Sequence, residues 1–267
     1  MAVVTAFLKR DFSLALSYRL SFLMQLFGIF FSVTSFYFLS RLFGNAMVPQ
    51  LKEYGGDYFS FVLIGLAFSG YLGLSISGFA QSIRDGQMMG TLEVMLLSPT
   101  RLSSILASSI LWPYLFTTLN VVVYLVVGSA VFGFNIGQAN LIASLVVMIL
   151  SIASFSGIGI LSAAIVLVIK KGDPVSGIYG SLSGLLSGVF YPISVLPNWL
   201  EPLSRFLPLT YALDAMRLTM LKGYSLYEVR YDLLILLVFT ALVTPLAFLT
   251  FRKALKRAKM EGSLVQY

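Results

Sequence analysis

Long stretches without a charged residue dominate this chain, and they mark its predicted elements. Uncharged stretches of 21, 26, 68, 27 and 19 residues follow Arg19, Asp57, Arg101, Asp173 and Asp232. About 20 apolar residues are enough for a helix to cross the roughly 30 Å hydrocarbon core of a membrane. The 68-residue stretch is too long for one span, and it divides at a Gly- and Asn-rich turn signal over residues 132–140.

The pattern therefore predicts an all-α membrane protein with a single transmembrane domain over residues 1–267. The six transmembrane helices are expected at residues 20–40, 58–83, 103–131, 141–169, 175–191 and 233–251. Residues 3–18, ahead of the first span, carry apolar side chains at helical spacing, namely Val4, Phe7, Leu8, Phe12 and Ala15. They predict an amphipathic helix in the membrane interface, although they could also be only the beginning of the first span.

The charges are divided unequally between the two sides of the predicted membrane domain. Six spans place both termini on one side, together with twelve basic and five acidic residues, and leave six of each on the other side. Since Lys and Arg are enriched in short cytoplasmic loops, both termini are expected to be cytoplasmic, in a cell (inner) membrane. The net charge of +7 then reports orientation, and no nucleic-acid partner is expected.

The amino-acid composition further limits the classes of protein and the kinds of site that the chain could form. The chain is 58% hydrophobic and only 11% charged, which excludes an ordinary soluble globular protein. It has no Cys and no His, so no metal site and no catalytic residues are expected. No charged residue falls within the six predicted spans, which argues against an ion-coupled carrier. No Lys precedes a Ser or Thr, so a Walker A loop is impossible and any nucleotide would bind to another chain.

Small residues recur at four-residue spacing in two of the predicted spans. The second span carries Gly65, Ser69 and Gly73, and the fifth carries Gly180, Gly184 and Gly188. Small side chains let helices approach closely in a membrane. The stripes indicate either ordinary packing within the chain or a mobile interface, in which these spans face each other or a second subunit.

A cytoplasmic segment after the second span, residues 84–101, has its own apolar face. Met88, Leu92, Met95 and Leu96 fall on one side of a helix that Pro99 should end. Such a helix could dock into a groove on a partner or lie on lipid, and the periodicity alone does not separate the two.

A second segment, residues 188–217, lies on the opposite side. It is too rich in Pro to cross the bilayer and too apolar for a free loop; Pro192 and Pro197 interrupt the apolar run. It predicts short, broken or re-entrant helices at the interface, or else an outer loop that only caps the bundle.

These two segments resemble the permease (transmembrane) subunits of type-two ABC exporters, the ABC-2 type transporter permease family. Gly90-Thr91-Leu92-Glu93 matches a short motif of that family after the second span, which is weak alone. More specific are the matches G-V-F-x-P at 188–192, L-P-x-W-L at 196–200 and P-L-T-Y-A-x-D-A-x-R at 208–217. The six-span layout and the N-terminal helix also match, so the resemblance covers nearly the whole chain.

The resemblance implies the membrane subunit of an ATP-driven exporter, which is not an enzyme by itself. Two permeases, as a homo- or heterodimer, would pair above two copies of an ABC ATPase subunit. No cofactor is expected in this chain, because ATP and Mg would sit on the partner. The expected cargo is amphipathic or lipophilic, weakly supported by aromatic pathway candidates such as Phe59, Phe61, Phe68 and Tyr71. The alternative is an ATP-independent channel or lipid scramblase, or a scaffold without flux.

The resemblance also assigns roles to individual residues. The helix that couples to the ATPase would contain Gly90, Thr91, Leu92, Glu93, Met95, Leu96 and Pro99. The outer gate or re-entrant region would contain Phe190, Pro192, Pro197, Trp199, Pro208, Thr210 and Tyr211. Helix packing along the pathway would involve Gly65, Ser69, Gly73, Gly180, Gly184 and Gly188.

Overall fold

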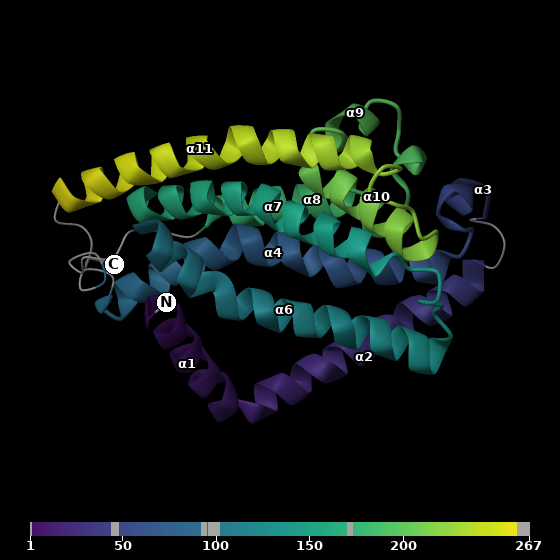
Figure 1. The fold of residues 1–267 in the computed structure, drawn as a ribbon, viewed down its shortest axis with the longest axis horizontal. Coiled ribbons are helices and arrows are strands. Elements are labelled where there is room, and N and C mark those ends of the chain that lie inside the picture. The colour runs from purple at the N-terminus through teal and green to yellow at the C-terminus, as the bar shows by residue number, and fades with distance from the viewer. Residues whose placement is uncertain (1, 44–47, 92–94, 96–101, 170–172, 261–267) are drawn as a thin grey trace.

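The computed structural model describes residues 2–43, 48–91, 95, 102–169 and 173–260 (Figure 1). In chain order, the regular elements are α1 (Ala2–Ser17), α2 (Arg19–Phe43), α3 (Val48–Leu51), η1 (Lys52–Tyr54), α4 (Tyr58–Met88), α6 (Leu102–Phe132), α7 (Leu141–Ile169), α8 (Pro174–Leu186), η2 (Ile193–Val195), α9 (Glu201–Ser204), α10 (Pro208–Leu221) and α11 (Arg230–Met260). Every regular element in these ranges is helical, which confirms the all-α prediction.

Five helices are long and apolar enough to cross a membrane. They comprise α2, α4, residues 104–132 of α6, α7 and α11, with 25 to 31 residues each. At 1.5 Å per residue, each exceeds the hydrocarbon thickness of about 30 Å. Five of the expected spans are therefore confirmed, and α4 and α11 continue beyond the limits that the charges suggested, to Met88 and Met260.

The fifth predicted span, 175–191, is shorter in the structure. Its helix α8 has 13 residues, about 20 Å of rise, and ends at Leu186. The Asp173 carboxylate begins the helix by accepting from the Ser176 backbone N–H at 3.1 Å, and it ties α8 to α7 by accepting from the Ser162 hydroxyl at 2.7 Å. Gly188 has a φ of +79°, a left-handed conformation that favours glycine and ends the helical path.

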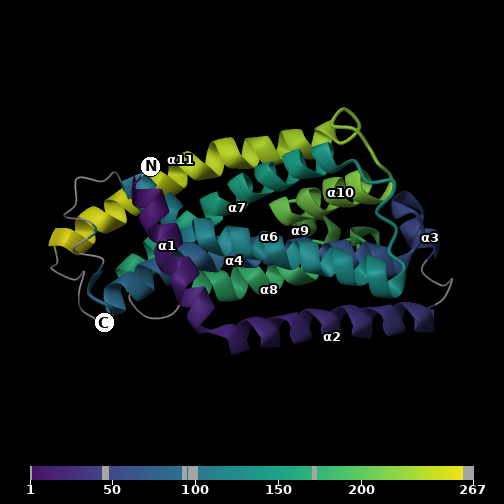
Figure 2. The same ribbon diagram turned by 60° about the horizontal axis from the view of Figure 1, so that its bottom comes forward.

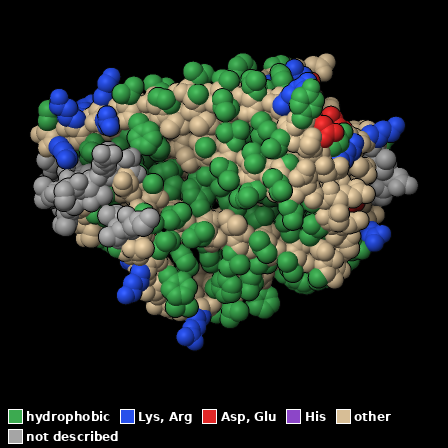
Figure 3. All heavy atoms as spheres, in the orientation of Figure 1, with side chains coloured by type: hydrophobic (Ala, Val, Ile, Leu, Met, Phe, Trp, Pro, Cys, Tyr) green, Lys and Arg blue, Asp and Glu red, His purple; other side chains and the backbone are tan. Residues whose placement is uncertain are grey.

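Helices α4 and α7 form the centre of the bundle. Within their apolar windows, 67% and 61% of the residues are buried, against 11% in α2, α6 and α11. The outer helices therefore present apolar side chains to their surroundings, and Figure 3 shows hydrophobic side chains spread over the middle of one face. In that view, Lys and Arg side chains gather towards the two ends.

The long helices run along the bundle, whereas α1 crosses it at a steep angle (Figure 2). Phe12 of α1 meets Trp112 of α6 edge to face, with 5.5 Å between the ring centres. Helix α1 begins, and α11 ends, at the same end of the bundle (Figures 1 and 2). We call the opposite end, which carries α3, η1, η2, α9 and α10, the distal end.

Candidate functional site

The distal end is organised around α10, a short helix that packs against α7, α11 and α4. Its buried residues are Pro208 to Thr210, Ala212, Leu213 and Ala215 to Met220. Pro208 stands in the first turn, where a missing N–H costs no hydrogen bond. The segment therefore inserts α10 into the bundle instead of merely covering it.

Arg217 of α10 is the central polar residue of this end. Its side chain is 3% exposed, and its Nε donates to the Phe61 carbonyl oxygen at 3.2 Å. Its Nη2 donates to the Val189 carbonyl oxygen at 3.0 Å, and the guanidinium lies 3.4 Å from the Phe61 ring centre. Arg217 thus holds α10 against α4 and against the non-helical segment between α8 and η2, residues 187–192, which we call the break after α8.

The electrostatic setting of Arg217 keeps its charge. Burial lowers the pKa of Arg217 to about 9, and the nearby Tyr54 and Asp214 oppose that shift. The side chain is therefore protonated at neutral pH. A buried charge is tolerated when it is hydrogen-bonded and faces an aromatic ring, and Arg217 has both kinds of contact.

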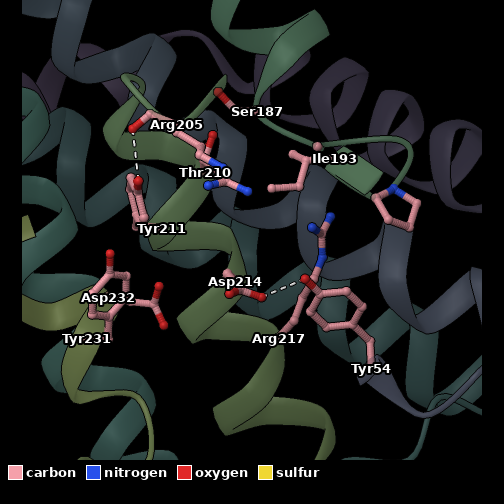
Figure 4. A pocket seen from close by; sticks show the side chains of 12 residues that line it. Tyr54, Ser187, Ile193, Arg205, Thr210, Tyr211, Asp214, Arg217, Tyr231 and Asp232 are labelled. Carbon is pink, nitrogen blue, oxygen red and sulfur yellow. Dashed lines mark hydrogen bonds between the residues drawn. The ribbon is translucent and has the colours of Figure 1, made fainter. Parts of the chain in front are cut away.

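Tyr54 and Asp214 complete the polar cluster. The Tyr54 hydroxyl of η1 donates to Asp214 Oδ1 at 2.6 Å, and Asp214 stands one helical turn before Arg217 (Figure 4). Burial raises the pKa of Asp214, although the hydrogen bond from Tyr54 opposes the shift. Burial also raises the pKa of Tyr54, so its hydroxyl remains a donor at neutral pH.

A cavity of about 200 Å³ adjoins this cluster, between α10, the beginning of α11 and the break after α8 (Figure 4). Its polar lining includes Ser187, Thr210, Tyr211, Asp214 and Asp232. The Thr210 hydroxyl donates to the Ser204 carbonyl at 2.7 Å, and the Tyr211 hydroxyl donates to the Arg205 carbonyl at 2.9 Å. These two bonds fix the entry into α10 relative to α9.

Two charged residues at this end are buried, although neither lies within the expected spans. Asp232 stands in the first turn of α11, inside a membrane-span candidate, and is only 8% exposed. Arg217 lies outside the five spans but binds the backbone of α4. The charge distribution along the sequence predicted that both residues lie on the outer side. It could not reveal that a short helix returns into the bundle.

The predicted outer-gate residues separate into two groups. Pro192, Thr210 and Tyr211 line the cavity, and Pro208 is buried at the beginning of α10. Phe190 stacks on Phe36 of α2, with 5.6 Å between the ring centres. The cavity lining does not include Pro197 and Trp199, and Trp199 is 72% exposed.

Sequence reasoning missed Tyr54, Tyr231 and Asp232 as members of this site. They come from segments more than 150 residues apart, and no local motif links them. The only available signal was an acidic residue directly before the last apolar run.

The small-residue stripes do not form one interface within the chain. A Cβ atom at Gly65 would lie 2.3 Å from the Val189 carbonyl oxygen and 2.7 Å from Nη2 of Arg217. A Cβ atom at Gly73, Gly180 or Gly184 would meet no heavy atom within 4 Å in the part of the chain that the structure describes. Ser69 donates to the Leu66 carbonyl of its own helix at 3.0 Å.

The predicted coupling segment is described only in part. Gly90 has a φ of +67° after the end of α4. Thr91 is exposed and Met95 is half-buried. Leu92, Glu93, Leu96 and Pro99 lie outside the described residues.

The aromatic pathway candidates are buried in the core of the single chain. Phe61 and Tyr71 are 0% and 2% exposed, and Phe59 and Phe68 are 5% and 9% exposed. In the described ranges these side chains belong to the packed hydrophobic clusters.

Comparison with known proteins identifies the family. Residues 3–221 match the family model described as ABC-2 type transporter. ABC transporter G family member 20 of Dictyostelium discoideum is 32% identical over 141 residues, which make up 52% of this chain and 19% of that protein. The match thus spans about a fifth of the relative's length. The matched family model describes the membrane part of such transporters. The predicted resemblance is confirmed: this chain belongs to the ABC-2 type transporter family.

Proposed function

We propose that this chain is the membrane-spanning subunit of an ATP-driven ABC exporter, which moves an amphipathic or lipophilic molecule outward. The observation that carries the proposal is the insertion of α10 into the distal end, where Arg217 binds both Phe61 of α4 and Val189 after α8. The hydrogen bonds from Arg217 to the backbone of α4 and to Val189 can break and re-form, as a gate requires. Alternating access would open this distal end to the outside.

The topology supports six passes with both termini in the cytoplasm of a cell (inner) membrane. Five spans alone would leave the termini on opposite sides, yet α1 begins and α11 ends at one end of the bundle. In our proposal, α8 and residues 187–200 together form the sixth pass, and α10 is re-entrant. The steep crossing of α1, with exposed Phe12 and Leu14, suits a helix in the membrane interface.

The energy would come from the partner subunits. We place two ATPase copies, with ATP and Mg, against a coupling helix made of Gly90, Thr91, Leu92, Glu93, Met95, Leu96 and Pro99. A second permease would face the side of α8 that carries Gly180 and Gly184, because a Cβ atom at either position would meet no heavy atom within 4 Å beyond the backbone of its own helix in the described chain. Glycine at these positions would let two such helices approach closely.

Reconstitution tests this proposal. The permease is purified with its candidate ATPase, inserted into liposomes and assayed for ATP-dependent accumulation of a fluorescent amphiphile. An ATPase whose phosphate-binding Lys is replaced serves as the control, and it should abolish transport while leaving the complex intact. Flux that continues without ATP or without the ATPase would instead support a channel or a lipid scramblase.

A further inference from the structure

The cavity at the distal end holds two carboxylates from different helices. Asp214 belongs to α10 and Asp232 to the first turn of α11, and both line the cavity of about 200 Å³. Figure 4 shows the Asp232 side chain on one side of α10 and the Asp214 carboxylate directed towards Tyr54. The Tyr54 hydroxyl donates to Asp214, so one of the two carboxylates is already partnered.

Asp232 has no such partner. It is 8% exposed, and no other residue in the described ranges donates a hydrogen bond to its carboxylate or forms an ion pair with it. Its only such contact is with its own backbone N–H. A buried carboxylate is costly unless it is paired, and Asp232 lines the cavity without an ion-pair partner in the described chain.

The nearby cationic side chains do not pair with the Asp232 carboxylate. Arg217 donates to two backbone carbonyls and faces the Phe61 ring, and none of its hydrogen bonds in the described chain reaches Asp232. Arg205 also lines the cavity, but it pairs with Glu201 at 2.6 Å. Asp214, Asp232 and Arg217 together carry a formal charge of −1, which one bound positive charge would neutralise.

The rest of the lining indicates the kind of cation. Tyr211 and Tyr231 line the cavity beside the carboxylates, and aromatic rings with carboxylates are a typical environment for ammonium groups. Divalent metals usually take more oxygen ligands, and no group of three or more acidic, His or Cys side chains suited to a metal occurs among the described residues. The volume accommodates a small substituted amine but not a whole lipid.

We infer that this cavity binds a small organic ammonium group, with the carboxylates of Asp232 and Asp214 as its counter-charges. The amine could belong to a free molecule or to the headgroup of a lipid at the distal membrane surface. The inference goes beyond ATP-driven export and does not depend on it.

Equilibrium binding to the purified full chain tests the inference without any ATPase or ATP. The chain is placed in nanodiscs of phosphatidylglycerol, and radiolabelled ethanolamine and tetramethylammonium are the probes. Saturable binding of at least one probe is expected. Asp232→Asn, which keeps the side-chain size, should weaken it at least tenfold, whereas Glu228→Gln removes an exposed carboxylate from the turn before α11 and should not.

Each outcome decides a specific point. Absence of saturable binding to the wild-type chain, or equal binding by Asp232→Asn, overturns the site. Displacement by Ca²⁺ without binding of either amine also overturns it, in favour of a metal. Gel filtration and the thermal midpoint of Asp232→Asn without probe verify that the variant is folded. Repeating the measurement in phosphatidylethanolamine nanodiscs identifies the source: weaker probe binding indicates the lipid headgroup, and unchanged binding indicates a free amine.

Discussion

Gly65 of α4 offers the sharpest test of the distal cluster. In Gly65→Ala, the new methyl group would lie 2.3 Å from the Val189 carbonyl oxygen and 2.7 Å from Nη2 of Arg217. Ordinary contact begins at 3.4 Å, so the Val189 carbonyl must withdraw by about 1 Å. That shift breaks the 3.0 Å hydrogen bond from Arg217, which holds the break after α8 to α10.

The expected cost follows from three terms. Overpacking a tight site costs about 1–3 kcal/mol, and losing a hydrogen bond from a charged group costs about 1.5–3 kcal/mol. Ala gains about 0.5–1 kcal/mol over Gly within a helix. The free energy of unfolding should therefore fall by about 2–5 kcal/mol.

SDS-driven unfolding of the purified chain in detergent, followed by circular dichroism, measures this loss. Gly73→Ala is the matched control, because it makes the same change in the same helix where no heavy atom lies within 4 Å of the new Cβ. The control should be neutral or more stable by up to about 1 kcal/mol. Equal unfolding midpoints for the two variants would refute the close approach of Val189 to α4.

Three further predictions concern other parts of the chain. Glu93→Arg should abolish copurification of the ATPase or uncouple ATP hydrolysis from transport; full transport would contradict the coupling-helix proposal. Gly184→Leu should reduce chemical crosslinking between permease copies, because the open face of α8 would no longer admit a close neighbour; unchanged crosslinking would assign the stripe to lipid contact. Since burial raises the pKa of Asp214, the folded state binds its proton more tightly, and the free energy of unfolding should decline as pH rises through that raised pKa. Asp214→Asn should flatten this part of the pH profile of unfolding, and an unaltered slope would argue against the burial of the carboxylate.

The spacing of charges predicted the long helices well, because a span of about 20 uncharged residues is a direct consequence of membrane thickness. It predicted α8 poorly, because a left-handed glycine, Gly188, ends that helix inside an apolar run. The motif at 208–217 located α10, but its sequence did not reveal what Arg217 contacts. The partners of Arg217 are backbone carbonyls 28 and 156 residues away in the sequence. Every residue has such a carbonyl, so the pattern of side chains cannot indicate which ones bind.

The unbroken length of α4 has a mechanical consequence. Its 31 residues form one stiff rod of about 46 Å, from beside Gly90 to the Arg217 contact. Phe61 lies about 18 Å from the midpoint of that rod, so a tilt of about 5° would displace its carbonyl by about 1.5 Å. The bond from Arg217 is 3.2 Å long, close to the upper limit for such bonds, and would not survive that displacement. A tilt of a few degrees imposed at one end of α4 would therefore release α10 at the other end. The helix would act as a lever that converts a small rotation into the loss of a hydrogen bond.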